Sequence, residues 1–168
     1  MKPPQTYKTA GSFRRALDDR FRNINRKDGT PFDRLRRWVA FDRLLARLFS
    51  SSDSQWILKG GYALELRFQS LARATRDIDF VIKKMKEPTK EKIQELLKAE
   101  CSKKLEDWFV FEIGPAMMDL DGPVYGGWRY PVEVFLDDRS FSKFHTDIVV
   151  ADTLDSKSEQ QKDRKSVV

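Results

Sequence analysis

A short apolar segment of this chain ends at two glycines, and a helical pattern begins directly after them. The segment spans residues 55–58, the glycines are Gly60 and Gly61, and residues 62–71 carry the helical pattern. Glycine has no Cβ atom, so the backbone can turn sharply and approach a phosphate closely. The first N–H groups of a helix also favour an anion. We expect a strand–turn–helix unit whose glycines serve either the turn alone or a bound phosphate.

Two carboxylates, Asp77 and Asp79, begin a second apolar segment at residues 77–82. Residues two apart in a strand point to the same face, so these side chains are expected side by side. They would repel each other and gain nothing from an apolar core. A divalent cation removes that conflict, because hard oxygen ligands suit Mg²⁺. The pair therefore predicts either a metal site or a solvent-exposed strand end.

A third carboxylate, Asp147, lies in an apolar run at residues 144–151. If this run pairs with residues 77–82, Asp147 completes a carboxylate triad of the kind that two-metal nucleotidyl transfer uses. Otherwise it is an edge residue. His145 is the one histidine of the chain and Cys101 the one cysteine, so a zinc site of the usual Cys/His type is excluded.

Three basic residues stand beside these motifs. Lys59 directly precedes the glycines, and Arg73 and Arg76 precede Asp77. The planar guanidinium group of arginine is suited to phosphate. We therefore expect these residues either to contact phosphate or to balance the carboxylate charge.

The remaining periodicity predicts an α+β protein with a mixed sheet flanked by helices. Three domain segments are expected: a basic helical segment at 1–54 packed on the core, the core at 55–152, and a polar, disordered tail at 153–168. The expected helices are 12–24, with Ser12 as N-cap, 32–49 and about 89–107; the expected strands are 108–113, 128–136 and 144–151, with turns at 114–123 and 137–140.

The net charge of +6 is concentrated near the N-terminus, where residues 1–50 hold 13 Lys/Arg and 5 Asp/Glu. Such a basic segment either contacts an RNA backbone through the arginines of residues 14–47 or serves solubility. No apolar run approaches the roughly 20 residues that span a bilayer. We expect no membrane partner and a cytoplasmic location.

Two joined motifs, LKGGYAL (58–64) and RATRDIDF (73–80), resemble the AbiEii/AbiGii toxin family. That family belongs to the DNA polymerase β-like nucleotidyltransferase superfamily. The later segments RYPV (129–132) and FSKFHTDI (141–148) are similar to its later strands, and the resemblance covers roughly residues 30–152.

The resemblance implies a nucleotidyltransferase-like fold and Mg²⁺-dependent transfer of a nucleoside monophosphate from a nucleoside triphosphate (NTP). RNA, tRNA above all, is the implied acceptor, and toxin–antitoxin or phage-defence systems are the implied setting. Gly60 and Gly61 match the nucleotide-binding turn. Asp77 and Asp79 match metal ligands, and Asp147 matches the third catalytic carboxylate.

Similar proteins continue past the third carboxylate with a largely helical region, whereas this chain continues with a polar tail. We therefore expect a C-terminally shortened form that exposes apolar surface to a second copy or to a cognate antitoxin. The alternative is a non-catalytic module that binds a nucleotide or a protein partner. A nuclease is less favoured, because a glycine turn before a helix suits a triphosphate better than a diester.

Overall fold

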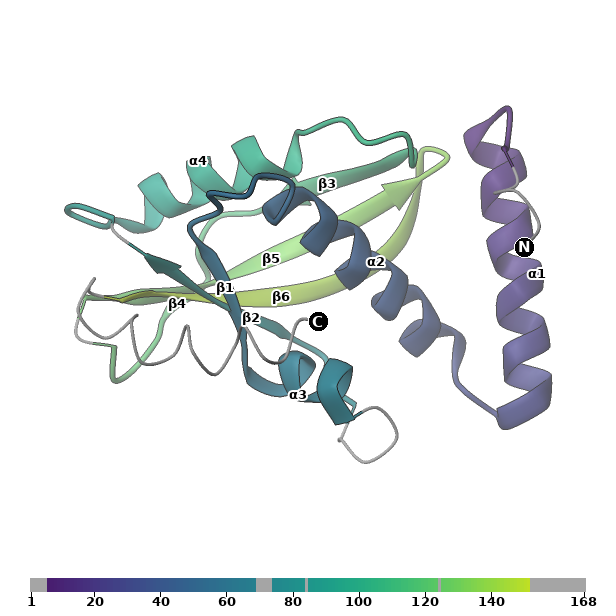
Figure 1. The fold of residues 1–168 in the computed structure, drawn as a ribbon, viewed down its shortest axis with the longest axis horizontal. Helices are drawn as coiled ribbons and strands as arrows, with labels where there is room; N and C mark the ends of the chain where they lie inside the picture. The colour runs from purple at the N-terminus through teal and green to yellow at the C-terminus, as the bar shows by residue number, and fades with distance from the viewer. Residues whose placement is uncertain (1–5, 69–73, 84, 124, 152–168) are drawn as a thin grey trace.

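A mixed six-stranded sheet flanked by helices forms the described part of the chain (Figure 1), which confirms the predicted α+β class. The computed structural model describes residues 6–68, 74–83, 85–123 and 125–151. The strands follow the order β1-β2-β6-β5-β3, and β4 pairs with β5. The elements are α1 (Ala10–Asp28), α2 (Phe32–Leu48), β1 (Trp56–Lys59), α3 (Gly60–Phe68), β2 (Ile78–Lys83), α4 (Lys90–Cys101), β3 (Phe109–Ile113), β4 (Met118–Asp119), β5 (Gly127–Leu136) and β6 (Arg139–Ala151).

The long β5–β6 hairpin forms the middle of the sheet. Its two turn residues, Asp137 and Asp138, have positive φ values of 57° and 54°. Two such residues in succession are typical of tight hairpin turns whose twist matches that of the strands. β6 then runs parallel to β2, and β2 runs antiparallel to β1. This pairing places the 144–151 run beside the 77–82 run.

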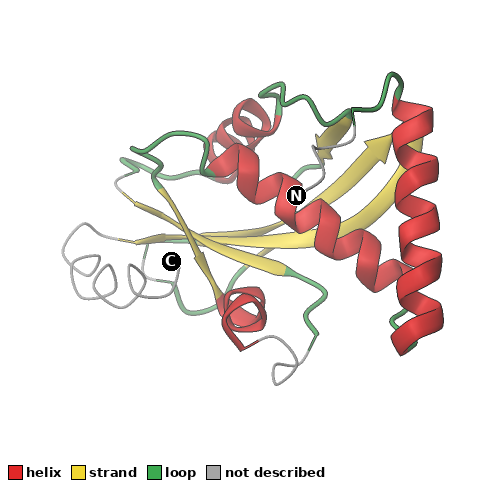
Figure 2. Ribbon diagram, turned by 45° about the vertical axis from the view of Figure 1, so that its right-hand side comes forward, coloured by secondary structure: helices red, strands yellow, loops and turns green. Residues whose placement is uncertain are grey.

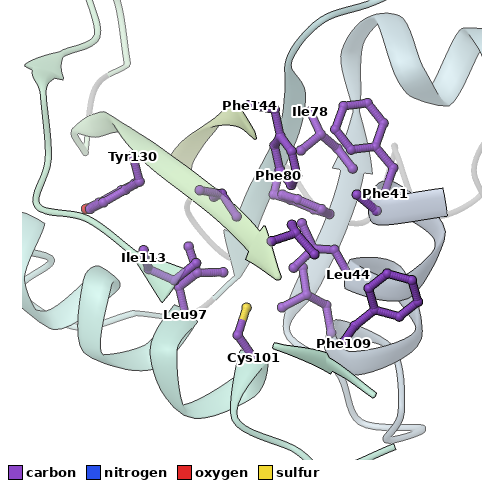
Figure 3. Close-up of a cluster of buried hydrophobic side chains, with 14 of the residues drawn as sticks. Phe41, Leu44, Ile78, Phe80, Leu97, Cys101, Phe109, Ile113, Tyr130 and Phe144 are labelled. Carbon is purple, nitrogen blue, oxygen red and sulfur yellow. The ribbon is translucent and has the colours of Figure 1, made fainter. Parts of the chain in front are cut away.

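The side chains of β5 and β6 alternate between two faces of the sheet. The buried face carries residues such as Tyr130 and Ile148, which have no exposed surface. Phe41 of α2 packs edge-on against Phe144, and the Tyr130 hydroxyl donates to the Lys90 carbonyl at the start of α4. Helices α2 and α4 therefore cover this face, and the core lies between them and the sheet (Figures 2 and 3).

Helix α1 begins at Ala10 and is longer than the predicted 12–24. Thr9 is its N-cap instead of Ser12, because the side chains of Thr9 and Ser12 each bond the other's backbone in a capping box. The buried Arg14 donates to the carbonyls of Leu136 and Arg139 at 2.7 and 3.2 Å. These bonds hold α1 on the turn end of the β5–β6 hairpin.

Arg47 of α2 and Asp107, which precedes β3, form a buried ion pair. Arg47 is one of the arginines of residues 14–47 that were expected to be available to an RNA, yet the structure leaves it 1% exposed. It donates to both Asp107 oxygens at 2.9 Å and to the Phe109 carbonyl at 3.0 Å. Helix α4 correspondingly ends at Cys101 rather than near 107, because the chain turns there to bring Asp107 to Arg47.

Two predictions fall outside the described residues, namely a role for Arg73 and the disordered tail at 153–168. The division of the chain at residues 54 and 152 also stays a prediction. Among the helices that the structure describes, none is both long and apolar enough to cross a membrane.

Candidate active site

The glycine turn and the carboxylate strand are in direct contact. Gly60 begins α3 directly after β1 and has a φ of 71°, a conformation that favours glycine. A Cβ atom at position 60 would overlap the carboxylate of Asp79. At Gly61, a Cβ atom would lie 3.3 Å from the side chain of Thr75. The positive φ and the close contact with Asp79 are therefore enough to favour glycine at position 60, whether or not a phosphate binds there.

The three predicted carboxylates come together on the sheet face opposite α2 and α4. Asp79 and Asp147 stand directly opposite each other in the parallel β2–β6 pairing. Asp77 lies just before β2, and its Oδ1 is 3.7 Å from Nδ1 of His145 on β6. Burial raises the pKa of Asp79 above its ordinary value, and the charges of Asp147 and Asp77 raise it further. The face thus concentrates negative charge.

Arg129 joins these carboxylates from β5, where it stands directly opposite Asp147. Its Nε and terminal nitrogen donate to the two Asp147 oxygens at 2.7 and 2.8 Å, and that terminal nitrogen lies 3.7 Å from Oδ2 of Asp77. The bidentate hydrogen bond to Asp147 raises the pKa of Arg129. Sequence reasoning did not assign Arg129 to the site. The alternation of β5 places it on this face, but only the β5–β6 register pairs it with Asp147.

Two of the three predicted basic residues lie near the carboxylates. Lys59 stands opposite Asp79 in the β1–β2 pairing, and its charge partly offsets the raised pKa of Asp79. Arg76 is exposed beside Asp77. Arg73 lies outside the described residues.

The buried Glu65 of α3 is a second residue that sequence reasoning missed. Its carboxylate accepts from the Trp38 indole at 2.7 Å, from Arg34 at 3.3 Å and from the Thr75 backbone N–H at 3.2 Å. It therefore ties α3 to α2 and to the segment before Asp77. A lone glutamate in a short helix gives no sequence signal for this role.

A groove of about 640 Å³ opens beside Asp77. Across β3 and β5, Glu112 stands directly opposite Glu133, which pairs with Lys143 at 3.2 Å. Asp77 lines this groove together with residues of β6, β5 and β3, whereas Gly60 follows β1, which pairs with the opposite edge of β2. The lining residues are Arg76, Asp77, Glu112, Gly114, Pro131, Val132, Glu133, Lys143, Phe144 and His145.

The sequence of this site matches a known family over residues 43–163, described as the nucleotidyl transferase AbiEii toxin of type IV toxin–antitoxin systems. The chain belongs to the AbiEii family. The match runs from within α2 past the end of β6, and it confirms the resemblance and the nucleotidyltransferase-like fold expected from the sequence. A search of curated proteins finds no match to the chain. Nucleotidyltransferases of this kind use an NTP together with a divalent metal ion.

Carboxylates of this number suit a divalent cation by their chemistry, because Mg²⁺ prefers hard oxygen ligands. In the part of the chain that the structure describes, however, no three His, Cys, Asp or Glu side chains are grouped closely enough to hold a metal ion. The Arg129 guanidinium already bonds Asp147 and lies near Asp77. The residue types therefore suit a divalent metal ion. In this structure the guanidinium of Arg129 is the cation that lies among the carboxylates.

Proposed function

We propose that this chain transfers a nucleoside monophosphate from an NTP to the 3′ end of an RNA, with tRNA as the acceptor to test first. The observation that supports the proposal is the contact of Gly60 with Asp79, which brings the glycine turn beside carboxylates that face each other across β2 and β6. Nucleotidyl transfer needs these two features together, because the triphosphate and its cation bind as one unit. The chain acts in the cytoplasm, where NTPs are available, as the toxin of a toxin–antitoxin or phage-defence system.

The glycine turn binds the triphosphate in this proposal. The backbone N–H groups of Gly60 and Gly61 stand at the start of α3, where the helix end favours an anion. Lys59 and Arg76 add positive charge on either side of the carboxylates, and Arg73 supplies more from outside the described residues. These cations neutralise phosphate oxygens and do not take part in bond making.

The carboxylates Asp77, Asp79 and Asp147 are the residues that would hold Mg²⁺. When bound, the metal lowers the pKa of the attacking hydroxyl and neutralises the leaving pyrophosphate. The protein supplies the register that keeps Asp79 opposite Asp147 and the contact that keeps Asp79 against the turn. Fixed placement of this kind contributes much of the rate in phosphoryl-type transfer.

The groove beside Asp77 receives the acceptor. In-line displacement requires the attacking hydroxyl to approach the α-phosphate from the side opposite to pyrophosphate. With the triphosphate at Gly60 near β1, that side faces β6 and β5, where the groove lies. Lys143 there offers positive charge to an RNA phosphate, and Glu112 and Glu133 accept hydrogen bonds from amino or hydroxyl groups.

An end-labelling assay tests the proposed reaction. The chain is incubated with Mg²⁺, total tRNA and one α-³²P-labelled NTP at a time. We expect label to enter the RNA from at least one α-labelled NTP and from no γ-labelled NTP, because pyrophosphate leaves. Transfer RNA whose terminal diol has been oxidised with periodate is the control and should stay unlabelled.

A non-catalytic module that binds a nucleotide or a protein partner is the second candidate. The bidentate contact of Arg129 with Asp147 favours it, since this contact occupies a carboxylate that catalysis needs. If NTPs bind with Mg²⁺ while no α-labelled NTP reaches the RNA, this candidate replaces the enzyme.

The apolar surface of α3 supports a protein partner. Leu64 and Phe68, which lie four residues apart on one side of α3, are each about half exposed, at 49% and 50%. We propose that this surface contacts a second copy of the chain when no antitoxin is bound. Light scattering at micromolar concentration tests this: a dimer is expected, and Leu64→Ser should shift it to monomer. A monomeric wild type would leave the antitoxin as the partner for this surface.

A further inference from the structure

We infer that Arg129 is a built-in counter-cation that a divalent ion must displace from Asp147 before the site can work. This inference rests on the proposed function, since it concerns the same carboxylates. Arg129 is then a positioning residue that sets when the carboxylates become free for a metal.

The geometry of the contact carries the inference. Arg129 and Asp147 stand directly opposite each other on β5 and β6, and two nearly parallel N–H donors reach the two oxygens of one carboxylate at 2.7 and 2.8 Å. Bidentate, charge-assisted pairs of this type are stronger than hydrogen bonds between neutral groups. Because one terminal nitrogen is also 3.7 Å from Asp77, a single guanidinium group spans two of the three carboxylates.

The charges around the guanidinium explain why a cation has to be there. Asp77, Asp79 and Asp147 gather on one face, and none of them is fully exposed. Lys59 faces Asp79 from the other side, but its side chain lies in the exposed part of β1. Without Arg129, Asp147 would lose its bidentate cation, and Lys59 would be left as the charge that compensates the facing Asp79. The fold therefore holds the site together in the absence of metal by using its own cation.

The exchange keeps the carboxylates and the phosphates compensated. A divalent ion that enters with the triphosphate compensates the carboxylates, and the Arg129 guanidinium is released toward the incoming phosphates. The planar guanidinium group can donate two hydrogen bonds to phosphate oxygens as well as to carboxylate oxygens. Arg129 remains anchored on β5, so it stays within reach of both partners, and it is 30% exposed along its side chain.

Binding of Mn²⁺ alone, without nucleotide, tests the exchange. The variants are Arg129→Gln, which removes the cation, and Arg129→Lys, which keeps the charge but loses the two-pronged contact. Arg139→Gln is the matched control, because Arg139 also pairs with an aspartate but lies at the turn end of the hairpin. Affinity is measured by calorimetry and by the electron paramagnetic resonance signal of free Mn²⁺.

Arg129→Gln should bind Mn²⁺ at least about tenfold more tightly than wild type, Arg129→Lys a few-fold more tightly, and Arg139→Gln equally. Metal-free Arg129→Gln should also melt at a lower temperature, and Mn²⁺ should restore it. Equal or weaker Mn²⁺ affinity in a folded Arg129→Lys or Arg129→Gln protein would overturn the inference. The two proposals can fail separately. Tighter Mn²⁺ binding by Arg129→Gln without RNA labelling would reject only the proposed nucleotidyl transfer. RNA labelling with unchanged Mn²⁺ binding by Arg129→Gln would reject only the proposed displacement of Arg129.

Discussion

The backbone of Gly60 fits against the carboxylate of Asp79 so closely that a methyl group at position 60 would overlap it. The glycine turn and the Asp-x-Asp motif are thus one packed unit, although 17 residues separate their first members in the sequence. Any change in the turn is expected to move the carboxylate as well. The same contact explains why the two motifs occur together.

Gly60→Ala should disturb both stability and nucleotide binding. An alanine at positive φ costs about 1–2 kcal/mol, and Asp79 must shift in addition. Gly29→Ala is the matched control, since Gly29 has a φ of 76° and no atom within 4 Å of the new methyl group. Urea unfolding should show a larger loss for Gly60→Ala, and calorimetry should show at least tenfold weaker Mg²⁺-NTP binding in that variant alone. Equal losses with nucleotide binding intact would mean that Asp79 moves aside freely.

Glu65→Ala should cost about 3 kcal/mol of unfolding free energy, because it leaves the Trp38 indole, Arg34 and the Thr75 N–H without their acceptor. Glu65→Gln keeps an acceptor and should cost about 1 kcal/mol. Asp19→Asn, which breaks an exposed pair with Arg22, should stay within about 0.5 kcal/mol of wild type. A wild-type stability for Glu65→Ala would show that α3 is held in place by other contacts.

Cys101 gives a prediction for alkaline pH. Burial raises the pKa of its thiol to about 12, so the folded state keeps the proton that the unfolded state loses from about pH 8.5 upward. The contribution of this thiol to stability therefore falls as pH rises above 8.5. The stability advantage of wild type over Cys101→Ala should shrink by about 1–2 kcal/mol between pH 7.5 and pH 10. A pH-independent difference in urea unfolding would contradict the burial of the thiol.

The basic N-terminal segment should act through a few exposed arginines only. Arg14 and Arg47 are buried, which removes them from the predicted RNA contacts, whereas Arg15, Arg20 and Arg26 of α1 are exposed. The triple alanine variant of these three should lower the salt dependence of tRNA binding by roughly 0.7–0.9 log units per lost contact. Its Mg²⁺-NTP affinity should be unchanged. An unaltered salt slope would mean that α1 serves solubility.

The distance along β6 explains why α1 should not affect the chemistry. Arg14 donates to the hairpin end at the Arg139 carbonyl, and Asp147 lies eight positions further along β6. At about 3.3 Å per residue this is roughly 26 Å. Contacts at α1 therefore position the body of an RNA and leave the reacting end untouched.

Local patterns predicted the fold class and singled out the glycine and carboxylate motifs. The glycines of positions 60 and 61 and the pair Asp77 and Asp79 stand at element boundaries that period-two alternation and turn chemistry make visible. Asp147 could be given only as conditional on strand pairing, because pairing partners are distant in sequence. The structure supplies that pairing through the parallel β2–β6 register.

The missed residues share one physical cause. Arg47, Glu65 and Arg129 are charged side chains whose partners, Asp107, Thr75 and Asp147, lie on other elements. Helical or strand periodicity assigns a charged residue to the solvent side, because burial of a charge is unfavourable without a partner. Only the tertiary structure shows that these partners exist, so single-sequence patterns cannot identify such pairs.

The central claim is that the carboxylates of β2 and β6 form the nucleotide site. Calorimetric titration with Mg²⁺-NTP tests it most directly, with the wild type compared with Asp79→Asn, Asp147→Asn and Asp119→Asn. Asp119 is the control, because it is exposed on β4. We expect at least tenfold weaker affinity in Asp79→Asn and Asp147→Asn, a loss of about 1.4 kcal/mol or more, and wild-type affinity in Asp119→Asn. Wild-type affinity in both Asp79→Asn and Asp147→Asn would contradict the account.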